Sequence, residues 1–396
     1  MQHDTFNILM YSHDTYGLGH IRRTMAIATN LLRPGVNILI LTGSPIVGRF
    51  DFPPGIDFVR IPGMIKQSNT VYIPHSIKVS PNHALRMRTD IITATAQAFD
   101  PSLFIVDKVP IGLRGEVLPT LQWFRKNRPQ SQLVLGLRDI LDDAQTTQAE
   151  WHKKNFNSVL RDLYDEIWIY GEQHMYDPIK EYAIPSDIGA KTVFTGYIPR
   201  QLPQVRAPGS NGCSHGSGEY KRIVVTTGGG GDGSPILDTY LSMLEQNASL
   251  NLDTLMIAGP FIPRTEYDKL AARAKTLGVD FRAFTNCLEK EIAQADLVIS
   301  MGGYNTVCEI LSMKQVALII PRDVPRKEQL IRAEVMSTQG LVDYLPWEKL
   351  TPDQLRVKIL RLLKNPEHYL ESVSSFKMTG LDVMRHRLEL FRRHVA

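Results

Sequence analysis

The sequence predicts an α/β protein made of two doubly wound parallel sheets. Short apolar segments alternate with segments of helical spacing along most of the 396 residues. Apolar strands separated by helices are typical of a parallel sheet that is covered on both faces. The alternation stops at 199–221, which is rich in Pro, Gly and Ser, and then restarts. We therefore expect two α/β domains joined by a flexible linker.

In the first domain, residues 1–198, short apolar runs predict strands, and helical spacing predicts the segments between them. The expected strands are 6–10, 38–41, 58–61, 103–106, 133–137 and 167–169. The expected helices are 20–32, 84–98, 115–125 and 151–163. In the first of these helices Ile21, Met25, Ala28 and Leu32 recur at helical spacing, so one face of the helix is apolar.

The second domain, residues 222–375, shows the same alternation. Its expected strands are 223–226, 255–258, 279–284, 297–300 and 316–320. Its expected helices are 236–244, 267–277, 288–295, 306–313 and 328–339. The rest of the chain is expected to be mainly helical, with helical spacing at 353–363 and 381–393, and 376–396 forms a final helical segment. In open parallel sheets, ligands bind beyond the carboxyl ends of the strands, so strand-to-helix turns are the candidate sites.

Composition narrows the classes of function. A net charge of +4 with interleaved acids and bases argues against a nucleic-acid partner, because such proteins concentrate basic side chains on one face. Cys213, Cys287 and Cys308 are too scattered for a disulfide framework or a zinc site and fit a reducing cytoplasm. The first residues do not form a signal peptide, and no apolar run approaches the length that spans a bilayer. We therefore expect a cytoplasmic protein and leave peripheral membrane contact open.

The segment SHDTYGLGHIRR leads from the first strand into the first helix. Gly17 and Gly19 allow a tight turn that brings N–H groups of the helix start close to a ligand, so they form a candidate acceptor or phosphate loop. Arg22 stands where a dinucleotide-binding turn has its third glycine, and the second strand ends without an acidic residue. The sequence therefore does not favour a nicotinamide cofactor.

His20 is the candidate catalytic base. It begins the first helix, whose positive end favours the neutral imidazole that a base requires. Asp107 ends the strand 103–106, lies on the same sheet edge and is the candidate residue that orients His20. A packing or capping role is the alternative for both residues. His13 and Asp14 are nearby and offer alternative contacts for a substrate.

Four consecutive glycines follow the first strand of the second domain: Gly228, Gly229, Gly230 and Gly231. A structural turn needs one or two glycines, whereas four leave the backbone amides open to an anion such as a diphosphate at a helix start. The loop therefore predicts anion binding, although it does not identify the anion. The phosphate-loop pattern G-x-x-x-x-G-K-[ST] does not occur in the sequence.

A second turn gives a more specific signal, because it combines glycines, polar side chains and an acid at a helix start. These residues are Gly302, Gly303, Asn305, Thr306 and Glu309. The amide or hydroxyl at the helix start can meet a phosphate. The carboxylate one turn later can accept hydrogen bonds from two vicinal ribose hydroxyls. An isolated acid on a helix would be solvated, but its place beside glycines at a sheet edge favours ligand contact.

Residues 281–336 resemble the donor-binding region of the GT-B glycosyltransferases, in particular the MurG-like family 28. The resemblance rests on ADLVISMGGYNTVCEI and on the proline and glutamine that follow it. GLGHIRRTMAIA resembles the first glycine loop of these proteins, and GGGG resembles the second. The whole chain looks like a branch of predicted glycosyltransferases. This implies two Rossmann-like domains that face a cleft and a last helix, 376–396, that packs back on the first domain.

The resemblance also implies roles in donor binding. Glu309 would bind the donor ribose, and Thr306 with the Gly302–Gly303 turn would lie at the diphosphate. Gln329 would contact the donor sugar or the diphosphate. The glycines 228–231 would border the phosphates and the acceptor, and His20 would be the general base.

The base of the donor has its own implied contacts. Phe284 would lie near a uracil-like base, and Thr285 would offer it backbone hydrogen bonds. The sequence departs from the family in the basic segment RDVPRKE, whose side chains could meet donor phosphates or an anionic acceptor. A solvated basic loop is the alternative interpretation. Met313-Lys314-Gln315 replaces a glycine-proline pair that the family often has at that helix end.

The activity that the resemblance implies is transfer of a hexose from a nucleotide-diphosphate donor, a UDP-sugar by family, to a hydroxyl acceptor. The sequence has no Asp-x-Asp metal motif, so we expect metal-independent, inverting transfer in which helix starts and amides stabilise the leaving diphosphate. No cofactor is expected besides the donor substrate. The alternatives are a sugar-nucleotide hydrolase or epimerase of the same fold, and a non-catalytic subunit that binds sugar nucleotides.

The acceptor is not identified by the sequence. A sugar, a lipid-linked sugar and a polysaccharide all fit, and the segment 75–88 is a candidate acceptor lip with apolar and basic residues. The final segment RHRLELFRRHVA is basic and amphipathic, and packing on the first domain is preferred to membrane contact. The expected location is therefore the cytoplasm, with peripheral attachment to the inner membrane face left open.

Overall fold

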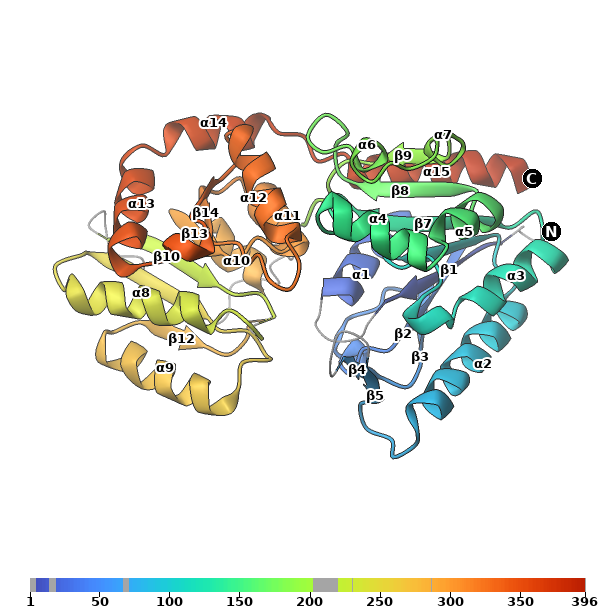
Figure 1. Cartoon of the computed structure of the whole chain (residues 1–396), viewed down its shortest axis with the longest axis horizontal. Coiled ribbons are helices and arrows are strands. Elements are labelled where there is room, and N and C mark those ends of the chain that lie inside the picture. Colours follow the sequence, from blue (N-terminus) through green and yellow to red (C-terminus); the bar gives the residue numbers. More distant parts are fainter. Residues whose placement is uncertain are drawn as a thin grey trace. The chain divides into compact units, whose positions relative to one another are not determined.

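A computed structural model of the chain describes residues 5–13, 19–66, 71–201, 220–229, 231–285 and 287–395 (Figure 1). The chain folds into two compact units. Unit 1 consists of residues 1–198 and 378–396, and unit 2 consists of residues 199–377. Most of the expected linker, 202–219, lies outside the described residues. The described part contains no helix that combines the length and the apolar character needed to cross a bilayer.

Unit 1 is built on a parallel sheet with the strand order β3-β2-β1-β6-β7-β8-β9. The strands are β1 (Phe6–Ser12), β2 (Val36–Thr42), β3 (Ile56–Arg60), β6 (Leu103–Asp107), β7 (Gln132–Arg138), β8 (Glu166–Tyr170) and β9 (Thr192–Phe194). A separate antiparallel pair is formed by β4 (Met64–Lys66) and β5 (Tyr72–Pro74). The central strands are apolar and buried on both faces, as a covered parallel sheet requires.

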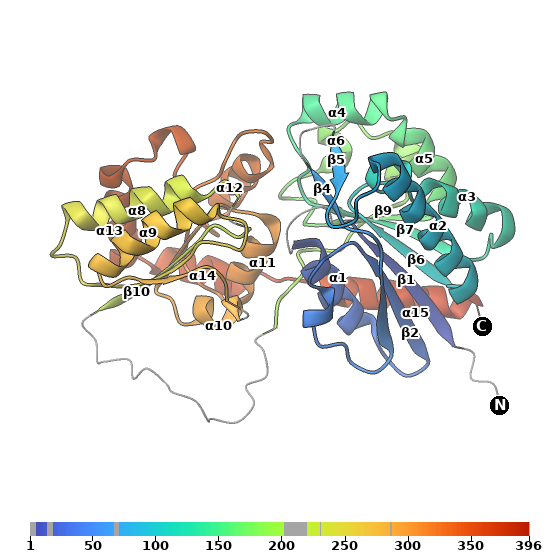
Figure 2. The ribbon, with the colours of Figure 1, turned by 90° about the horizontal axis from the view of Figure 1, so that it is seen from below.

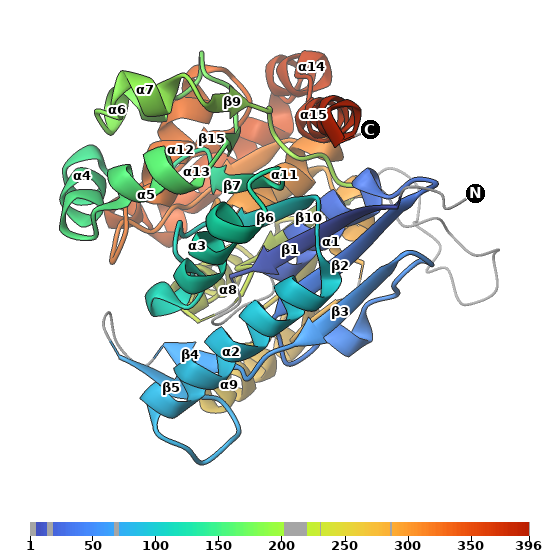
Figure 3. The same cartoon turned by 90° about the vertical axis from the view of Figure 1, so that its right-hand side faces the viewer.

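Helices cover both faces of this sheet, with α1 and α15 on one face and α2, α3 and α5 on the other (Figures 2 and 3). The helices are α1 (Gly19–Leu31), α2 (Pro81–Phe99), α3 (Leu118–Asn127), α4 (Ala144–Lys153), α5 (Phe156–Leu163), α6 (Pro178–Glu181), α7 (Ser186–Gly189) and α15 (Gly380–Val395), with 3₁₀ turns η1 (Val47–Arg49) and η2 (Leu113–Gly115). Helix α15 is anchored by Arg387, which pairs with Glu166, and by Phe391, whose ring stacks on Trp168 at 6.5 Å between centroids. The C-terminal helix therefore belongs to unit 1.

Unit 2 repeats this plan with the parallel order β12-β11-β10-β13-β14-β15. Its strands are β10 (Lys221–Thr226), β11 (Leu252–Ile257), β12 (Asp280–Arg282), β13 (Leu297–Ser300), β14 (Ala317–Ile319) and β15 (Asp343–Tyr344). Its helices are α8 (Ser234–Gln246), α9 (Arg264–Thr276), α10 (Leu288–Ala293), α11 (Tyr304–Ser312), α12 (Glu328–Thr338), α13 (Pro352–Lys364) and α14 (Glu367–Ser375), with the 3₁₀ turn η3 (Trp347–Lys349). Two parallel-sheet α/β units confirm the fold class expected from the sequence.

Some boundaries differ from the sequence prediction. The helix expected at 151–163 is two helices, because α4 ends at Lys153 and Asn155 adopts a left-handed conformation with φ of 51° before α5 begins. Asparagine tolerates that conformation better than most residues, and the left-handed residue interrupts the helix there. Helix α11 begins at Tyr304, two residues before the expected start. At its far end Lys314 takes φ of 56°, and its Nζ donates to the carbonyls of Val373 and Phe376.

The order of the strands places the candidate sites. In unit 1 the chain moves outward from β1 to β2 and β3, then returns to add β6 on the other side of β1. The helices that follow β1 and β6 therefore lie on opposite faces of the sheet, and ligands bind at the carboxyl edge at such a reversal of strand order. Unit 2 has the same reversal between β10 and β13.

Helix α13 allows a direct test of the core of unit 2. Leu362 is 1% exposed and belongs to the core, whereas Leu360 on the same helix is 38% exposed. We expect Leu362→Ala to lower the free energy of unfolding of unit 2 by about 2–5 kcal/mol, because it removes buried methyl groups and leaves a cavity. Leu360→Ala should cost less than about 1 kcal/mol. Urea denaturation of both variants makes the comparison, and equal losses would contradict the packing of α13.

Candidate functional site

The site in unit 1 begins with the turn between β1 and α1. Residues 14–18, which include Gly17, lie outside the described residues, and Gly19 is the first residue of α1. His20 follows it in the first turn of the helix. The strand β1 pairs with β6, with Tyr11 opposite Val106, so Asp107 follows at the same edge. The pairing therefore brings the two candidate catalytic residues from separate parts of the sequence to one place.

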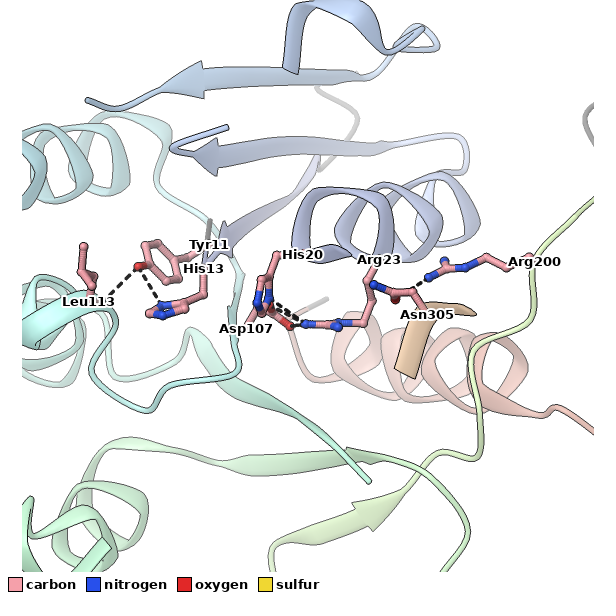
Figure 4. Close-up of polar contacts among 8 residues, drawn as sticks. All are labelled: Tyr11, His13, His20, Arg23, Asp107, Leu113, Arg200 and Asn305. Atoms are coloured by element: carbon pink, nitrogen blue, oxygen red, sulfur yellow. Dashed lines mark hydrogen bonds and ion pairs between the residues drawn. The ribbon is translucent and has the colours of Figure 1, made fainter. Parts of the chain in front are cut away.

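His20 and Asp107 are in direct contact. The distance between His20 Nδ1 and Asp107 Oδ2 is 2.6 Å, and both side chains are largely buried (Figure 4). A carboxylate carries no proton to donate, so the hydrogen of this contact is on Nδ1 of the imidazole. Nε2 of His20 then carries the lone pair, which is the arrangement that a general base needs. Whether His20 and Asp107 act in catalysis stays a prediction.

Arg23, which was not predicted from the sequence, completes this cluster. It lies one turn after His20 on α1 and is 2% exposed. Its Nη2 is 2.7 Å from both carboxylate oxygens of Asp107, and its Nε donates to Oδ1 at 3.1 Å. The same Nη2 lies 3.0 Å from Nδ1 of His20. The spacing of three residues between His20 and Arg23 was the available signal, because such residues lie on the same side of a helix.

The charges in this cluster fix its protonation. Burial lowers the pKa of His20 to about 4 and outweighs the opposing effect of Asp107, while Lys108 and Arg23 lower it further. Burial raises the pKa of Asp107, but Arg23 and His20 outweigh it and hold that pKa well below its usual range. At neutral pH the cluster therefore contains a neutral imidazole, a carboxylate and a guanidinium.

A second buried polar chain lies beside the first and ends on His13. Tyr11 donates its hydroxyl hydrogen to Glu116 at 2.6 Å, and Glu116 is held by Arg88. His13 Nδ1 lies 3.4 Å from the Tyr11 hydroxyl, and the His13 and His20 rings are 5.8 Å apart between centroids. Burial, Lys108 and His20 hold the pKa of His13 well below its usual value, so this imidazole is neutral as well. The sequence predicts that His13 lies near the site, but it does not predict the buried polar chain that ends on it.

In unit 2, the two glycine turns lie side by side. Strands β10 and β13 are neighbours, with Thr226 opposite Ser300, so Gly228 and Gly302 follow at the same edge. Both have positive φ, 67° and 78°. A Cβ atom on residue 228 would lie 3.7 Å from the hydroxyl oxygen of Thr306, and a Cβ on residue 302 would lie 2.6 Å from Ile319. Gly302 is therefore required by both its backbone conformation and its close packing.

The remaining glycines of the first turn are placed less tightly. Gly230 lies outside the described residues. Apart from the chain neighbours of each glycine, no atom of the described residues lies within 4 Å of the position that a Cβ on Gly231, or on Gly303 in the second turn, would occupy. The amide of Phe261, from the loop after β11, donates to the Gly229 carbonyl at 3.0 Å. The loop after β11 therefore supports the glycine turn from the side.

Residues of α11 and α12 surround the second turn. Thr306 is buried near the start of α11, and Glu309, one turn later, is only 1% exposed. Gln329, near the start of α12, accepts a hydrogen bond from the Arg322 amide at 3.3 Å. Arg332, one turn further along α12, donates to the Gly302 carbonyl at 3.2 Å. The structure thus brings the turn, α11 and the start of α12 together, and the roles of these residues in donor binding stay predictions.

The residues predicted for the base lie further along the same sheet edge. Phe284 follows β12 and is 44% exposed. The Thr285 hydroxyl accepts a hydrogen bond from the Cys287 amide at 3.3 Å. Strand β12 is separated from β10 by β11, so this segment lies two strands away from the strand that leads into the first glycine turn.

Arg200 is another residue that was missed in the sequence. Its Nη2 donates to Asn305 Oδ1 at 2.9 Å, and its amide donates to the Ser312 hydroxyl at 2.8 Å, so it lies along α11 (Figure 4). This brings a guanidinium to the start of the helix where the sequence predicts a phosphate. The sequence predicts a linker at this position because of its prolines, so it does not single out Arg200.

Comparison with known families and curated proteins gives matches to part of the chain. Residues 223–386 match the glycosyltransferase family 28 C-terminal domain. A UDP-N-acetylglucosamine–N-acetylmuramyl-(pentapeptide) pyrophosphoryl-undecaprenol N-acetylglucosamine transferase of Streptococcus agalactiae is 37% identical over 162 residues, which are 35% of this chain and 45% of that protein. The protein of the same name from Bacillus cytotoxicus is 26% identical over 198 residues, 48% of this chain and 53% of that protein. The chain thus spans about half the length of these two relatives.

Solved structures resemble the whole chain. The glycotransferase of kitacinnamycin has a TM-score of 0.67 at 14% identity and covers 99% of this chain and 100% of its own. MurG of Acinetobacter baumannii has a TM-score of 0.60 at 15% identity and covers 98% of this chain and 99% of its own. These likenesses show that the chain has the GT-B fold of these glycosyltransferase structures. In addition, residues 223–386 are similar to the glycosyltransferase family 28 C-terminal domain.

Proposed function

We propose that this protein transfers a sugar from a nucleotide-diphosphate donor, a UDP-sugar, to an acceptor hydroxyl, with inversion and without a metal ion. The observation that carries the proposal is the 2.6 Å contact between His20 and Asp107 at the carboxyl edge of unit 1. The family 28 domain in unit 2 supports the donor half. The curated relatives are named as transferases of N-acetylglucosamine from a UDP donor, which favours the same class of donor for this chain.

The proposed chemistry of unit 1 is a single proton transfer. Nε2 of His20 takes the proton of the acceptor hydroxyl while the oxygen attacks the anomeric carbon of the donor. The bond from that carbon to the diphosphate oxygen breaks, and the nucleotide diphosphate leaves with the electron pair. Asp107 holds Nδ1–H and stabilises the imidazolium that forms. Attack from the face opposite the leaving group inverts the anomeric centre.

Unit 2 is proposed to bind the donor and to stabilise the leaving group. The N-terminus of α11 presents backbone amides and a positive dipole end to the diphosphate. The guanidinium of Arg200, held by Asn305 at that helix start, adds a positive charge that needs no metal ion. Glu309 is proposed to accept hydrogen bonds from the ribose hydroxyls, and Gln329 to contact the donor sugar or diphosphate. Phe284 is proposed to lie against the nucleotide base.

The acceptor is proposed to be a sugar hydroxyl on a lipid-linked or polysaccharide molecule. The names of the curated relatives specify a pyrophosphoryl-undecaprenol acceptor, which supports the lipid-linked class. Ile77 and Lys78 are exposed within the candidate lip, and Val71 is exposed shortly before it in the sequence. Apolar side chains beside basic ones fit peripheral contact with a membrane that carries such a lipid.

The first test removes the proposed base. We expect His20→Ala to lower kcat for sugar transfer by about 100-fold or more, because general-base catalysis typically contributes that much. Asp107→Asn should lower kcat as well, since the asparagine no longer fixes the tautomer of His20. Transfer is measured by mass spectrometry of the glycosylated product, with a panel of sugar nucleotides and lipid-linked or free sugar acceptors.

His152→Gln serves as the matched control, because His152 is an exposed histidine of the same unit on α4. It should leave the rate unchanged. Wild-type rates in His20→Ala would disprove the base assignment. Release of free sugar with no glycosylated product, for every acceptor, would show a sugar-nucleotide hydrolase instead.

The pH dependence gives a second test. The pKa of His20 is lowered to about 4, and the base is lost only when the ring is protonated below that pKa. We therefore expect kcat/KM to stay level as the pH falls from 7 towards 5 and to drop near pH 4. An ordinary exposed imidazole would give a drop near its usual pKa of about 6.5. Circular dichroism at each pH separates this limb from acid unfolding.

The donor half is tested by Glu309→Gln. If the carboxylate accepts hydrogen bonds from the ribose, the variant should bind UDP about ten-fold more weakly, because bonds to a charged group are stronger than bonds to an amide. Isothermal titration calorimetry with UDP measures the dissociation constant. Glu266→Gln, at an exposed position on α9, is the control. Equal affinities for Glu309→Gln and wild type would rule out the ribose role.

A further inference from the structure

Arg23 makes more contacts with Asp107, the partner of the candidate base, than a single salt bridge requires. Its Nη2 contacts both oxygens of Asp107 at 2.7 Å and also lies 3.0 Å from Nδ1 of His20. All three side chains are buried or nearly so. Burying a guanidinium is costly unless it is paired and hydrogen-bonded. The contacts of Arg23 therefore bear on the orientation and the protonation of His20.

Elementary electrostatics shows what Asp107 would do alone. A buried carboxylate at 2.6 Å favours a positive charge on the imidazole and would tend to hold a second proton there. A protonated ring cannot accept a proton from a hydroxyl. The guanidinium of Arg23 compensates the carboxylate charge and so acts in the same direction as burial, which is the largest effect that lowers the pKa of His20. Among the described residues, Lys108, from the loop after β6, and the His13 ring after β1 also face His20.

The fold holds Arg23 in place from its other side. The guanidinium carbon of Arg23 lies 5.8 Å from the centre of the Tyr170 ring at the end of β8. Tyr170 in turn lies across β7, because residue 136 has no side chain: a Cβ atom there would be 1.8 Å from the Tyr170 hydroxyl oxygen. A cation over an aromatic face is attracted to it, and more strongly in a dry environment. The ring of Tyr170, which has room because Gly136 carries no side chain, therefore packs against Arg23.

We propose that Arg23 is a positioning residue of the base: it holds both oxygens of Asp107, so that the carboxylate orients His20 through Nδ1 without keeping a second proton on the ring. This inference rests on the proposed function for its consequence in catalysis. Its electrostatic part concerns His20 alone and is measurable without any substrate. A merely structural Arg23 would affect folding but would not change the proton affinity of His20 in a folded protein.

The experiment is an NMR titration of His20 in the full chain labelled with ¹⁵N-histidine, with the His20 signal assigned through His20→Gln. In Arg23→Met we expect the pKa of His20 to rise by about one unit or more, a ten-fold gain in proton affinity, because the Asp107 carboxylate then acts uncompensated. The double variant Arg23→Met with Asp107→Asn removes both charges. It should bring the pKa back towards the wild-type value.

Arg22→Met is the matched control, since it removes the same charge from the neighbouring position of the same helix. It should leave the His20 titration close to that of wild type. An unchanged pKa in folded Arg23→Met, or an equal rise in Arg22→Met, would overturn the proposal. If Arg23→Met does not fold, the proposal is tested by the double variant and by Arg23→Lys. A His20 pKa in the double variant well above wild type would contradict the compensation.

Arg23→Lys separates charge from geometry. Lysine keeps the positive charge but cannot hold both carboxylate oxygens in the same bidentate way. We expect a His20 titration near that of wild type together with a several-fold lower kcat and an unchanged KM. A wild-type kcat in Arg23→Lys would limit the role of Arg23 to its charge and overturn its positioning role. The pKa of His20 could rise in Arg23→Met while the wild-type protein transfers no sugar. That result would support this inference and disprove the proposed function.

Discussion

The pairing of β1 with β6, and of β10 with β13, is the constraint on which both candidate sites depend. Each pair sits where the strand order reverses, which is the point at which ligands bind at the carboxyl edge of such sheets. In unit 1 this pairing brings His20 and Asp107, 87 positions apart in sequence, to within 2.6 Å. In unit 2 it brings the glycine turn at Gly228 beside Thr306. The strand pairing thus determines which residues of the sequence come together at each site.

Buried charge is the second organising feature of unit 1. Two arginines, Arg23 and Arg88, lie in its interior, and each is bound to a carboxylate near an imidazole. Desolvation of such pairs is expensive, and apolar side chains would have served stability equally well or better. Such pairs have a reason if each fixes the orientation of a neighbouring side chain. The pair of Arg23 then orients His20, and the pair of Arg88 orients Tyr11 with His13. Stability spent in this way is typical of a functional site.

The sequence was sufficient for the architecture and for the residues at strand ends. His20, Asp107 and the two glycine turns could be predicted, because parallel strands end at one edge and glycines mark the turns there. Arg23 and Arg200 could not, since their importance depends on distances across the fold that no local pattern encodes. The helix at 151–163 was predicted without its break, because the apolar spacing continues through Asn155 and only the left-handed backbone interrupts it. Residues such as Glu309 were identified by resemblance, and their ligand contacts stay predictions.

Helix α15 closes unit 1 with residues that come after all of unit 2 in the sequence. During synthesis, unit 2 can therefore complete its core while unit 1 still lacks the helix that covers α1 and Trp168. The apolar face left open on the nascent unit 1 is covered only after α15 has been made. Unit 1, which carries His20, is therefore completed after unit 2, so a chain that is cut short within α15 has a complete unit 2 and an unfinished unit 1.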